Sequence, residues 1–254
     1  RGAGQPGGGA ERLTVMADPL LLLPGLMCDA RLWGPVQERL WALVPERDRY
    51  AGAHVAALRG ARSAPDLAAR LLRHAPPRFA LAGAALGAMV ALEMVAQAPE
   101  RITRLALLAG DARPDALEKA PARFRLLEAM EREGARTMVA REFWPDAVPA
   151  ARREDAALFD LLCDMADTLG PAVLREQTAV LIHRADSRPR LAAIQVPVLL
   201  ISGEEDRLCP PARMQEIAET VPGARAMLLP GVGHLPSLEA PEAVAAGFAE
   251  WLAA

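Results

Sequence analysis

Short apolar runs that alternate with longer helical patterns constrain the fold of this chain more than any other feature of its sequence. Each run is followed by a stretch of helix-forming residues, which is typical of a parallel sheet with helices on both faces. The runs lie at 20–23, 50–55, 78–82, 102–109, 196–202 and 225–229. The sequence therefore predicts an α/β fold with a doubly wound, mostly parallel sheet.

The segment between residues 111 and 194 interrupts this alternation. It has no convincing strand pattern, and prolines and glycines separate its helical stretches. We therefore expect a helical cap over 111–194, inserted into a core made of residues 16–110 and 195–254. Residues 1–15 are rich in glycine, and we expect them to form a disordered tail.

The most informative stretch is the turn Gly83-Ala84-Ala85-Leu86-Gly87, which joins an apolar run to a helical pattern. It matches the G-x-S-x-G nucleophile elbow at both glycines, but Ala85 stands where the serine is expected. Small residues two positions before and after the centre let the strand and the helix approach each other. Taken alone, the turn is also compatible with an ordinary glycine-containing turn of an α/β protein.

Four segments together resemble the α/β-hydrolase family, and in particular its small bacterial esterase-like members. They are PGLMCDARLW for the oxyanion loop, AGAALGAMVALEMVAQAPERITRLALLAG for the elbow and the following helix and strand, VPVLLISGEEDRLCPP for the acid, and LLPGVGHLPSLEAPEAV for the histidine. The resemblance covers residues 20–252. It implies a catalytic triad in the chain order nucleophile, acid, histidine.

The resemblance also implies a role for individual positions. Ala85 occupies the nucleophile position, Asp206 is the acid and His234 is the general base, whose ordinary pKa lies near neutrality. The backbone amides of Leu26 and Leu86 are the implied oxyanion donors. No metal and no organic cofactor is implied.

The identity of the acid leaves alternatives open. Asp206 also has a structural interpretation, as a cap for the helix that follows Pro210. Asp111, at the end of the preceding predicted strand, is the reserve candidate for the acid, and Glu204 and Glu205 are weaker candidates.

Ala85 has two explanations. We favour deliberate replacement of a serine to trap a substrate, because the acid, the histidine and the oxyanion loop are all present. Otherwise the protein is naturally without the serine, and either binds a ligand or uses Asp206 and His234 as a base. Cys28 lies on the wrong loop to replace the missing nucleophile.

The predicted function of the serine form is hydrolysis of a small carboxylic ester through an acyl-enzyme. The chain with alanine should be almost inactive, because loss of the nucleophile leaves only the rate supplied by binding and the oxyanion hole. The alternatives are a cofactor-free, non-hydrolytic enzyme that uses the histidine as a base, and a catalytically dead ligand-binding protein.

Composition and charge narrow the expected partners. A net charge of −3 argues against nucleic acid, and no apolar run is long enough to cross a bilayer. Three scattered cysteines fit a reducing cytoplasm. We expect a cytoplasmic bacterial protein, a monomer or homodimer, that binds an apolar acyl or aryl ester. A second possibility is that cap arginines bind a carboxylate or an acidic carrier protein, although a solvated face is the default for Arg123, Arg125, Arg141, Arg152 and Arg153.

Overall fold

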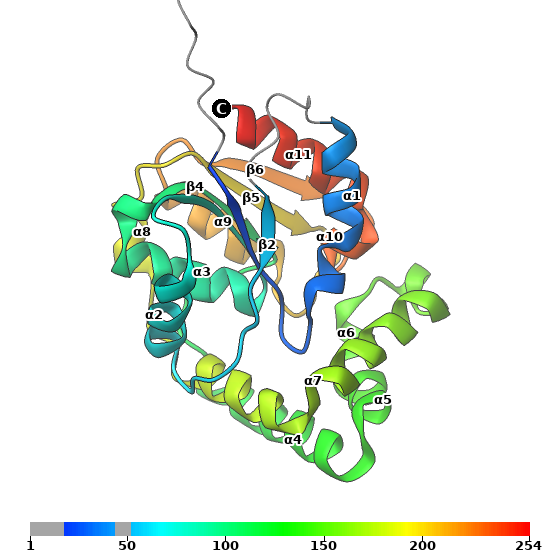
Figure 1. The fold of residues 1–254 in the computed structure, drawn as a ribbon. Helices are drawn as coiled ribbons and strands as arrows, with labels where there is room; N and C mark the ends of the chain where they lie inside the picture. Colours follow the sequence, from blue (N-terminus) through cyan, green and yellow to red (C-terminus); the bar gives the residue numbers. More distant parts are fainter. Residues whose placement is uncertain (1–17, 44–51) are drawn as a thin grey trace, which may run out of the picture.

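The computed structural model describes residues 18–43 and 52–254, which form a six-stranded sheet with helices on both faces (Figure 1). Its strands are β1 (Leu20–Leu23), β2 (Ala53–Val55), β3 (Phe79–Ala84), β4 (Ile102–Leu108), β5 (Val198–Gly203) and β6 (Arg225–Leu229). Their spatial order is β2-β1-β3-β4-β5-β6, and all neighbouring pairs are parallel.

The predicted α/β fold with a doubly wound sheet is confirmed. The predicted tail at 1–15 lies outside the described residues, as does the start of the second predicted strand.

The strands are continuously apolar because both faces of the sheet are covered. Leu20 and Leu22 belong to a core that includes Trp33 and Phe248, whereas Leu21 and Leu23 belong to a second core on the other face. The helices that flank the sheet, with two single turns, are η1 (Ala30–Leu32), α1 (Gly34–Leu43), α2 (Ala64–His74), α3 (Leu86–Gln97), η3 (Pro99–Arg101), α9 (Pro211–Thr220), α10 (Pro236–Glu239) and α11 (Pro241–Ala253).

The chain between β4 and β5, all of which the structure describes, is helical and contains no strand. Its elements are η4 (Leu117–Lys119), α4 (Ala120–Glu133), α5 (Ala135–Met138), η5 (Val139–Phe143), α6 (Trp144–Ala147), η6 (Ala150–Arg152), α7 (Ala156–Ile182) and α8 (Arg188–Leu191). The label α7 covers two helices that meet at Gly170, where φ is +74°.

Residues 117–182 are called the insert below; its helices α4 to α7 lie together beside the core in Figure 1. The proposed division into a core and a cap at residues 111 and 194 stays a prediction. No helix in the described ranges is long and apolar enough to cross a membrane.

Candidate active site

Ala85 forms the sharp turn between β3 and α3. Its backbone has φ +49° and ψ −111°, a region that residues other than glycine rarely adopt. Such a conformation costs about 1–3 kcal/mol and persists only where the surrounding structure enforces it. The Ala85 amide donates a hydrogen bond to the carbonyl of Leu108 over 2.8 Å, which fixes the turn against the end of β4. The elbow conformation is therefore present although its central side chain is a methyl group.

Two glycines make the elbow sterically possible. A Cβ at Gly83 would lie 2.4 Å from the carbonyl oxygen of Gly87. A Cβ at Gly87 would lie 2.3 Å from the carbonyl oxygen of Leu23 in β1. Neither distance is compatible with a side chain, because the opposing atoms belong to the backbone. The close approach of strand and helix expected from the sequence is thus confirmed.

Asp206 and His234 lie side by side, as the sequence predicted. Asp206 follows β5, and His234 follows β6. The Nδ1 atom of His234 lies 2.8 Å from Oδ2 of Asp206, and the Asp206 side chain is fully buried. Its other oxygen, Oδ1, accepts a hydrogen bond from the amide of Cys209 over 2.8 Å. The carboxylate therefore holds the histidine and also caps the turn that precedes α9.

The reserve candidate for the acid, Asp111, is occupied elsewhere. It is buried, accepts a hydrogen bond from the Arg113 amide over 2.9 Å, and lies 3.9 Å from the guanidinium of Arg184 and 3.7 Å from that of Arg213. The structure thus pairs His234 with Asp206, not with Asp111. The weaker candidates, Glu204 and Glu205, are exposed.

The two predicted oxyanion donors are Leu86, which belongs to the elbow, and Leu26, on the loop after β1. Leu26 and Leu86 line the same hollow as Ala85 and His234. A Cβ at Gly25 would lie 3.7 Å from Cβ of Ala85, so the loop after β1 passes in contact with the elbow. Hydrogen bonds among residues 18–43 and 52–254 include none donated by the amides of Leu26 or Leu86. Within these ranges both amides are therefore without an acceptor.

Gln177, which the sequence analysis did not single out, holds this oxyanion loop in place. It lies in α7 and is fully buried. Its Oε1 accepts a hydrogen bond from the amide of Met27 over 2.9 Å, and its Nε2 donates one to the carbonyl of Leu58 over 2.9 Å. Met27 has a φ of +53°, so this single side chain stabilises an unusual backbone conformation beside Leu26. A glutamine within a long helix carries no motif that would have revealed this role.

Glu239 is the second residue that the sequence analysis missed. It lies at the end of α10 and is buried, with 5% of its surface exposed. Its carboxylate accepts hydrogen bonds from the amides of Gly233 over 3.0 Å and Leu235 over 2.9 Å, the two residues that flank His234. Burial raises the pKa of Glu239, and these two hydrogen bonds oppose that rise. A carboxylate five residues after the histidine was the available signal.

The insert contacts the histidine loop directly. The amide of His234 donates to the carbonyl of Ala147 over 2.7 Å. A Cβ at Gly233 would lie 2.5 Å from that same carbonyl oxygen. The Phe143 ring meets the imidazole edge-on, with 6.2 Å between ring centres. The insert therefore helps to fix the position of the predicted base.

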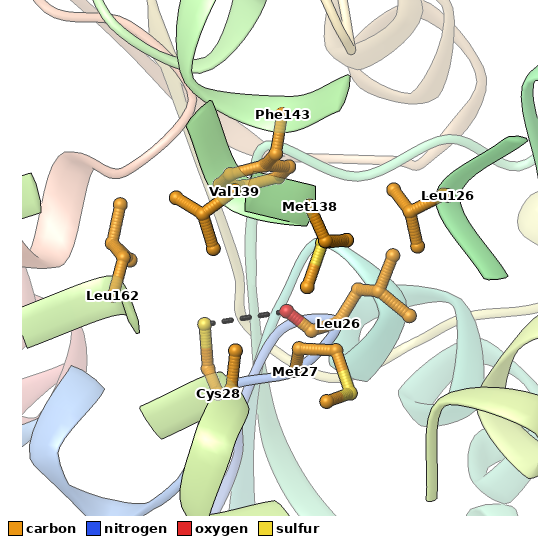
Figure 2. A pocket seen from close by; sticks show the side chains of 9 residues that line it. Leu26, Met27, Cys28, Leu126, Met138, Val139, Phe143 and Leu162 are labelled. Atoms are coloured by element: carbon orange, nitrogen blue, oxygen red, sulfur yellow. Dashed lines mark hydrogen bonds between the residues drawn. The ribbon is translucent and has the colours of Figure 1, made fainter. Parts of the chain in front are cut away.

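Three hollows meet at Leu26 on the loop after β1. One, with a volume of about 20 Å³, touches the elbow itself and is lined by Gly25, Leu26, Cys28, Leu32, Ala84, Ala85, Phe143, His234, Leu235, Pro236 and Ser237. The other two differ in size and chemistry. The smaller, called the apolar pocket below, has a volume of about 20 Å³ and lies between the oxyanion loop and the insert (Figure 2). It is lined by Leu26, Met27, Cys28, Leu126, Met138, Val139, Phe143, Leu162 and Ala166. The larger, called the cleft below, has a volume of about 500 Å³ and contains Ala85, Leu86 and His234 together with many charged side chains.

Of the five cap arginines considered from the sequence, Arg123, Arg125 and Arg141 line the cleft. Arg152 instead donates to the backbone carbonyl of Glu239 over 2.8 Å, and Arg153 donates to that of Pro145 over 3.2 Å.

Cys28 lies in the apolar pocket, where its thiol donates to the carbonyl of Leu26 over 3.4 Å (Figure 2). Burial, helped by the charge of Asp29, raises the pKa of this thiol to about 12. The thiolate needed for nucleophilic attack is therefore not formed near neutral pH. Among the described residues, no group of three His, Cys, Asp or Glu side chains is placed to hold a metal ion.

Known proteins resemble this chain in sequence and in fold. The model of the alpha/beta hydrolase family matches residues 20–247. A pimeloyl-[acyl-carrier protein] methyl ester esterase of Neisseria meningitidis serogroup C is 30% identical over 176 residues, which cover 67% of this chain and 68% of that protein. The thermophilic esterase of Thermogutta terrifontis is 26% identical, with a TM-score of 0.80 over 94% of this chain and 90% of the other. The enol-lactonase of Burkholderia xenovorans LB400 has the same fold, with 21% identity and a TM-score of 0.79 over 94% of this chain and 92% of the other.

Proposed function

Because this chain belongs to the alpha/beta hydrolase family, we propose that it is built to hydrolyse carboxylic esters, with residue 85 as the nucleophile position. The observation that carries the proposal is the 2.8 Å contact between His234 and Asp206, with the imidazole and Ala85 lining one cleft. A base oriented by a buried carboxylate, beside a strained strand-to-helix turn, is the arrangement that activates a hydroxyl nucleophile.

The chemistry of a serine at position 85 follows from these positions. As its Oγ attacks the acyl carbon, His234 accepts the hydroxyl proton, and the carboxylate of Asp206 stabilises the imidazolium that forms. The amides of Leu26 and Leu86 hold the negative charge on the former carbonyl oxygen. His234 then returns the proton to the leaving alcohol, and a water molecule cleaves the acyl-enzyme by the same steps. The methyl group of Ala85 has neither a lone pair nor a transferable proton, so the chain with alanine binds an ester without forming the covalent intermediate.

The substrate that we propose is a small ester. The relative from Neisseria meningitidis is named for a methyl ester, and the apolar pocket, which shares Leu26 and Phe143 with the cleft and has a volume of about 20 Å³, suits a group of about that size. For comparison, a cavity measured in this way needs roughly 10–15 Å³ to hold one water molecule, which is about the size of a methyl group. Larger apolar groups require the side chains of the insert to move. The pocket as it stands therefore suits the methyl group of an ester alcohol better than the apolar acyl or aryl group expected from the sequence.

A second candidate function, base catalysis without a nucleophile, is supported by a specific observation. The His234–Asp206 pair is assembled without a hydroxyl at residue 85, so it can remove a proton from a ligand directly. In that case the chain with Ala85 is an active, non-hydrolytic enzyme.

One experiment separates the two functions. Ala85→Ser should create hydrolysis of short p-nitrophenyl esters and of methyl esters, by roughly 10⁶-fold in kcat, the scale by which loss of a triad serine lowers it. His234→Ala in the serine background should abolish this activity. A serine variant that folds but hydrolyses no ester, beside an Ala85 protein that transforms another substrate, would overturn the ester-hydrolase proposal in favour of base catalysis.

A further inference from the structure

The residues that line the cleft carry an excess of positive charge, although the whole chain has a net charge of −3. Seven cationic side chains line it, and three carboxylates oppose them. The cations are Lys119, Arg123, Arg125, Arg141, Arg184, Arg207 and Arg213; the carboxylates are Asp111, Glu142 and Asp146. Because low-dielectric walls focus the field of such a group, the cleft attracts anions.

Most of these cations have carboxylate partners. The pairs are Arg123 and Arg184 with Asp115, Arg184 and Arg213 with Asp111, Arg125 with Glu142, and Arg141 with Glu133. Within the described part of the chain, Lys119 and Arg207 have no ion pair. Of the three carboxylates in the cleft, only Asp146 has no ion pair with another described residue, and its side chain is exposed. The cleft therefore has two cations ready to bind an anion and one acid that opposes them.

The two unpaired cations come from different parts of the molecule. Lys119 ends η4 and immediately precedes α4 of the insert, whereas Arg207 follows the proposed acid Asp206 on the loop after β5. Both side chains nevertheless line the same cleft. Lys119 is also the only lysine of the chain. An anion in the cleft would thus contact both the insert and the core.

We propose that the cleft binds an anionic group of the substrate, a carboxylate or a phosphate, through Lys119 and Arg207. The ester bond of the same molecule would lie over residue 85, with its small apolar group in the apolar pocket. The position of the ester rests on the proposed function; the anion site itself does not. A cleft of about 500 Å³ is within the usual range of ligand pockets, roughly 300–1,000 Å³. Charge-assisted hydrogen bonds from two donors would then select an anionic ester over a neutral one.

Binding to the protein with Ala85 tests the anion site without any chemistry. Monomethyl adipate, dimethyl adipate and a methyl ester with a terminal phosphate are compared by calorimetry and thermal shift at low and high salt. We expect the monoester or the phosphate to bind at least about tenfold more tightly than the diester, a difference of about 1.4 kcal/mol. The preference should shrink as salt rises. The first and third probes distinguish carboxylate from phosphate. Equal affinity for all three overturns the proposal.

Matched variants test the two residues. Lys119→Met and Arg207→Gln should each reduce the preference for the anionic ester, and Lys119→Arg should retain it because the charge is kept. Arg73→Gln, on the exposed face of α2 and outside the cleft, is the control and should leave the preference unchanged. Thermal melting shows that each variant is folded. A preference that survives the double substitution of Lys119 and Arg207 overturns their assignment.

Kinetics of the Ala85→Ser form test the anion site and the ester-hydrolase function separately. In Ala85→Ser protein, the ratio of kcat/KM for the monoester to that for the diester should exceed one and fall on Lys119→Met. Hydrolysis of both esters at equal rates would refute the anion site and leave the ester-hydrolase function standing. Tight binding of the monoester without hydrolysis by the serine form would do the opposite.

Discussion

Replacing Glu239 by alanine should destabilise the protein and misplace its proposed base. The carboxylate accepts two hydrogen bonds from buried amides that flank His234. A hydrogen bond to a charged group contributes about 1.5–3 kcal/mol, so the two together contribute about 3–6 kcal/mol. Burial outweighs these bonds in its effect on the carboxylate, since the pKa of Glu239 is raised, but removal of the carboxylate leaves two buried amides without an acceptor, at about 1–3 kcal/mol each. We expect a net loss of about 2–4 kcal/mol in the free energy of unfolding.

Urea denaturation of the Ala85 protein and of its Glu239→Ala variant measures this loss. In a chain of this size each kcal/mol lowers Tm by about 2–4 °C, so the melting temperature should fall by about 4–16 °C. Glu242→Ala is the matched control, because Glu242 is a nearby glutamate with a side chain 71% exposed and an ion pair to Arg39. Such an exposed pair contributes about 0–1 kcal/mol.

The same substitution should affect catalysis in the Ala85→Ser form. Without the two hydrogen bonds, the loop that carries His234 is free to shift, and kcat should fall more than KM rises. A stability loss no larger than that of Glu242→Ala, with kcat unchanged, would refute the view that Glu239 positions the histidine. A stability loss with kcat and KM unchanged would make its role purely structural.

Two further predictions concern the elbow and the buried charges. Gly87→Ala should cost about 3 kcal/mol or more, because its Cβ would lie 2.3 Å from a backbone oxygen, whereas Gly34→Ala meets nothing within 4 Å and should be neutral or stabilising; chemical denaturation compares them. Burial alone would raise the pKa of Asp115, but Arg123 and Arg184 outweigh it and hold the pKa below its ordinary value of 3.8. The ionised carboxylate therefore stabilises the fold above pH 3.8 and loses this effect as the pH falls through the lowered value. Asp115→Asn should cost about 3 kcal/mol at pH 7 and progressively less in unfolding measurements at acid pH.

The sheet was predictable because each of its strands is a local apolar run. Leu20–Leu23 is apolar at every position, since alternate residues enter the two cores on opposite faces. The elbow was predictable for a similar reason: Gly83 and Gly87 are required by contacts within one strand, one turn and one helix, together with the adjacent β1. The pairing of Asp206 with His234 followed from the resemblance, and the structure brings these two side chains together.

Of the two supporting residues, Glu239 had a local signal in the sequence, but Gln177 could not be predicted, because its partners are distant backbone groups. Gln177 binds Met27, 150 residues away in the sequence, and no local pattern encodes such a contact. The insert shows the same difficulty. Phe124 of α4 is 61% exposed, whereas Leu126 of the same helix lines the apolar pocket. A helix with apolar residues on several faces does not reveal from its sequence which face is covered.

The strained elbow explains why a serine at position 85 is a clean test of the function. The left-handed conformation of Ala85 is imposed by its hydrogen bond to Leu108 and by the contacts of the two elbow glycines, not by its side chain. Alanine and serine both have a Cβ, so both bear about the same backbone strain there, on the order of 1–3 kcal/mol. The substitution therefore adds one oxygen atom beside an existing base, acid and pair of amide donors. A change in rate between the two forms then reports the chemistry of that oxygen, because the backbone that positions it is already in place.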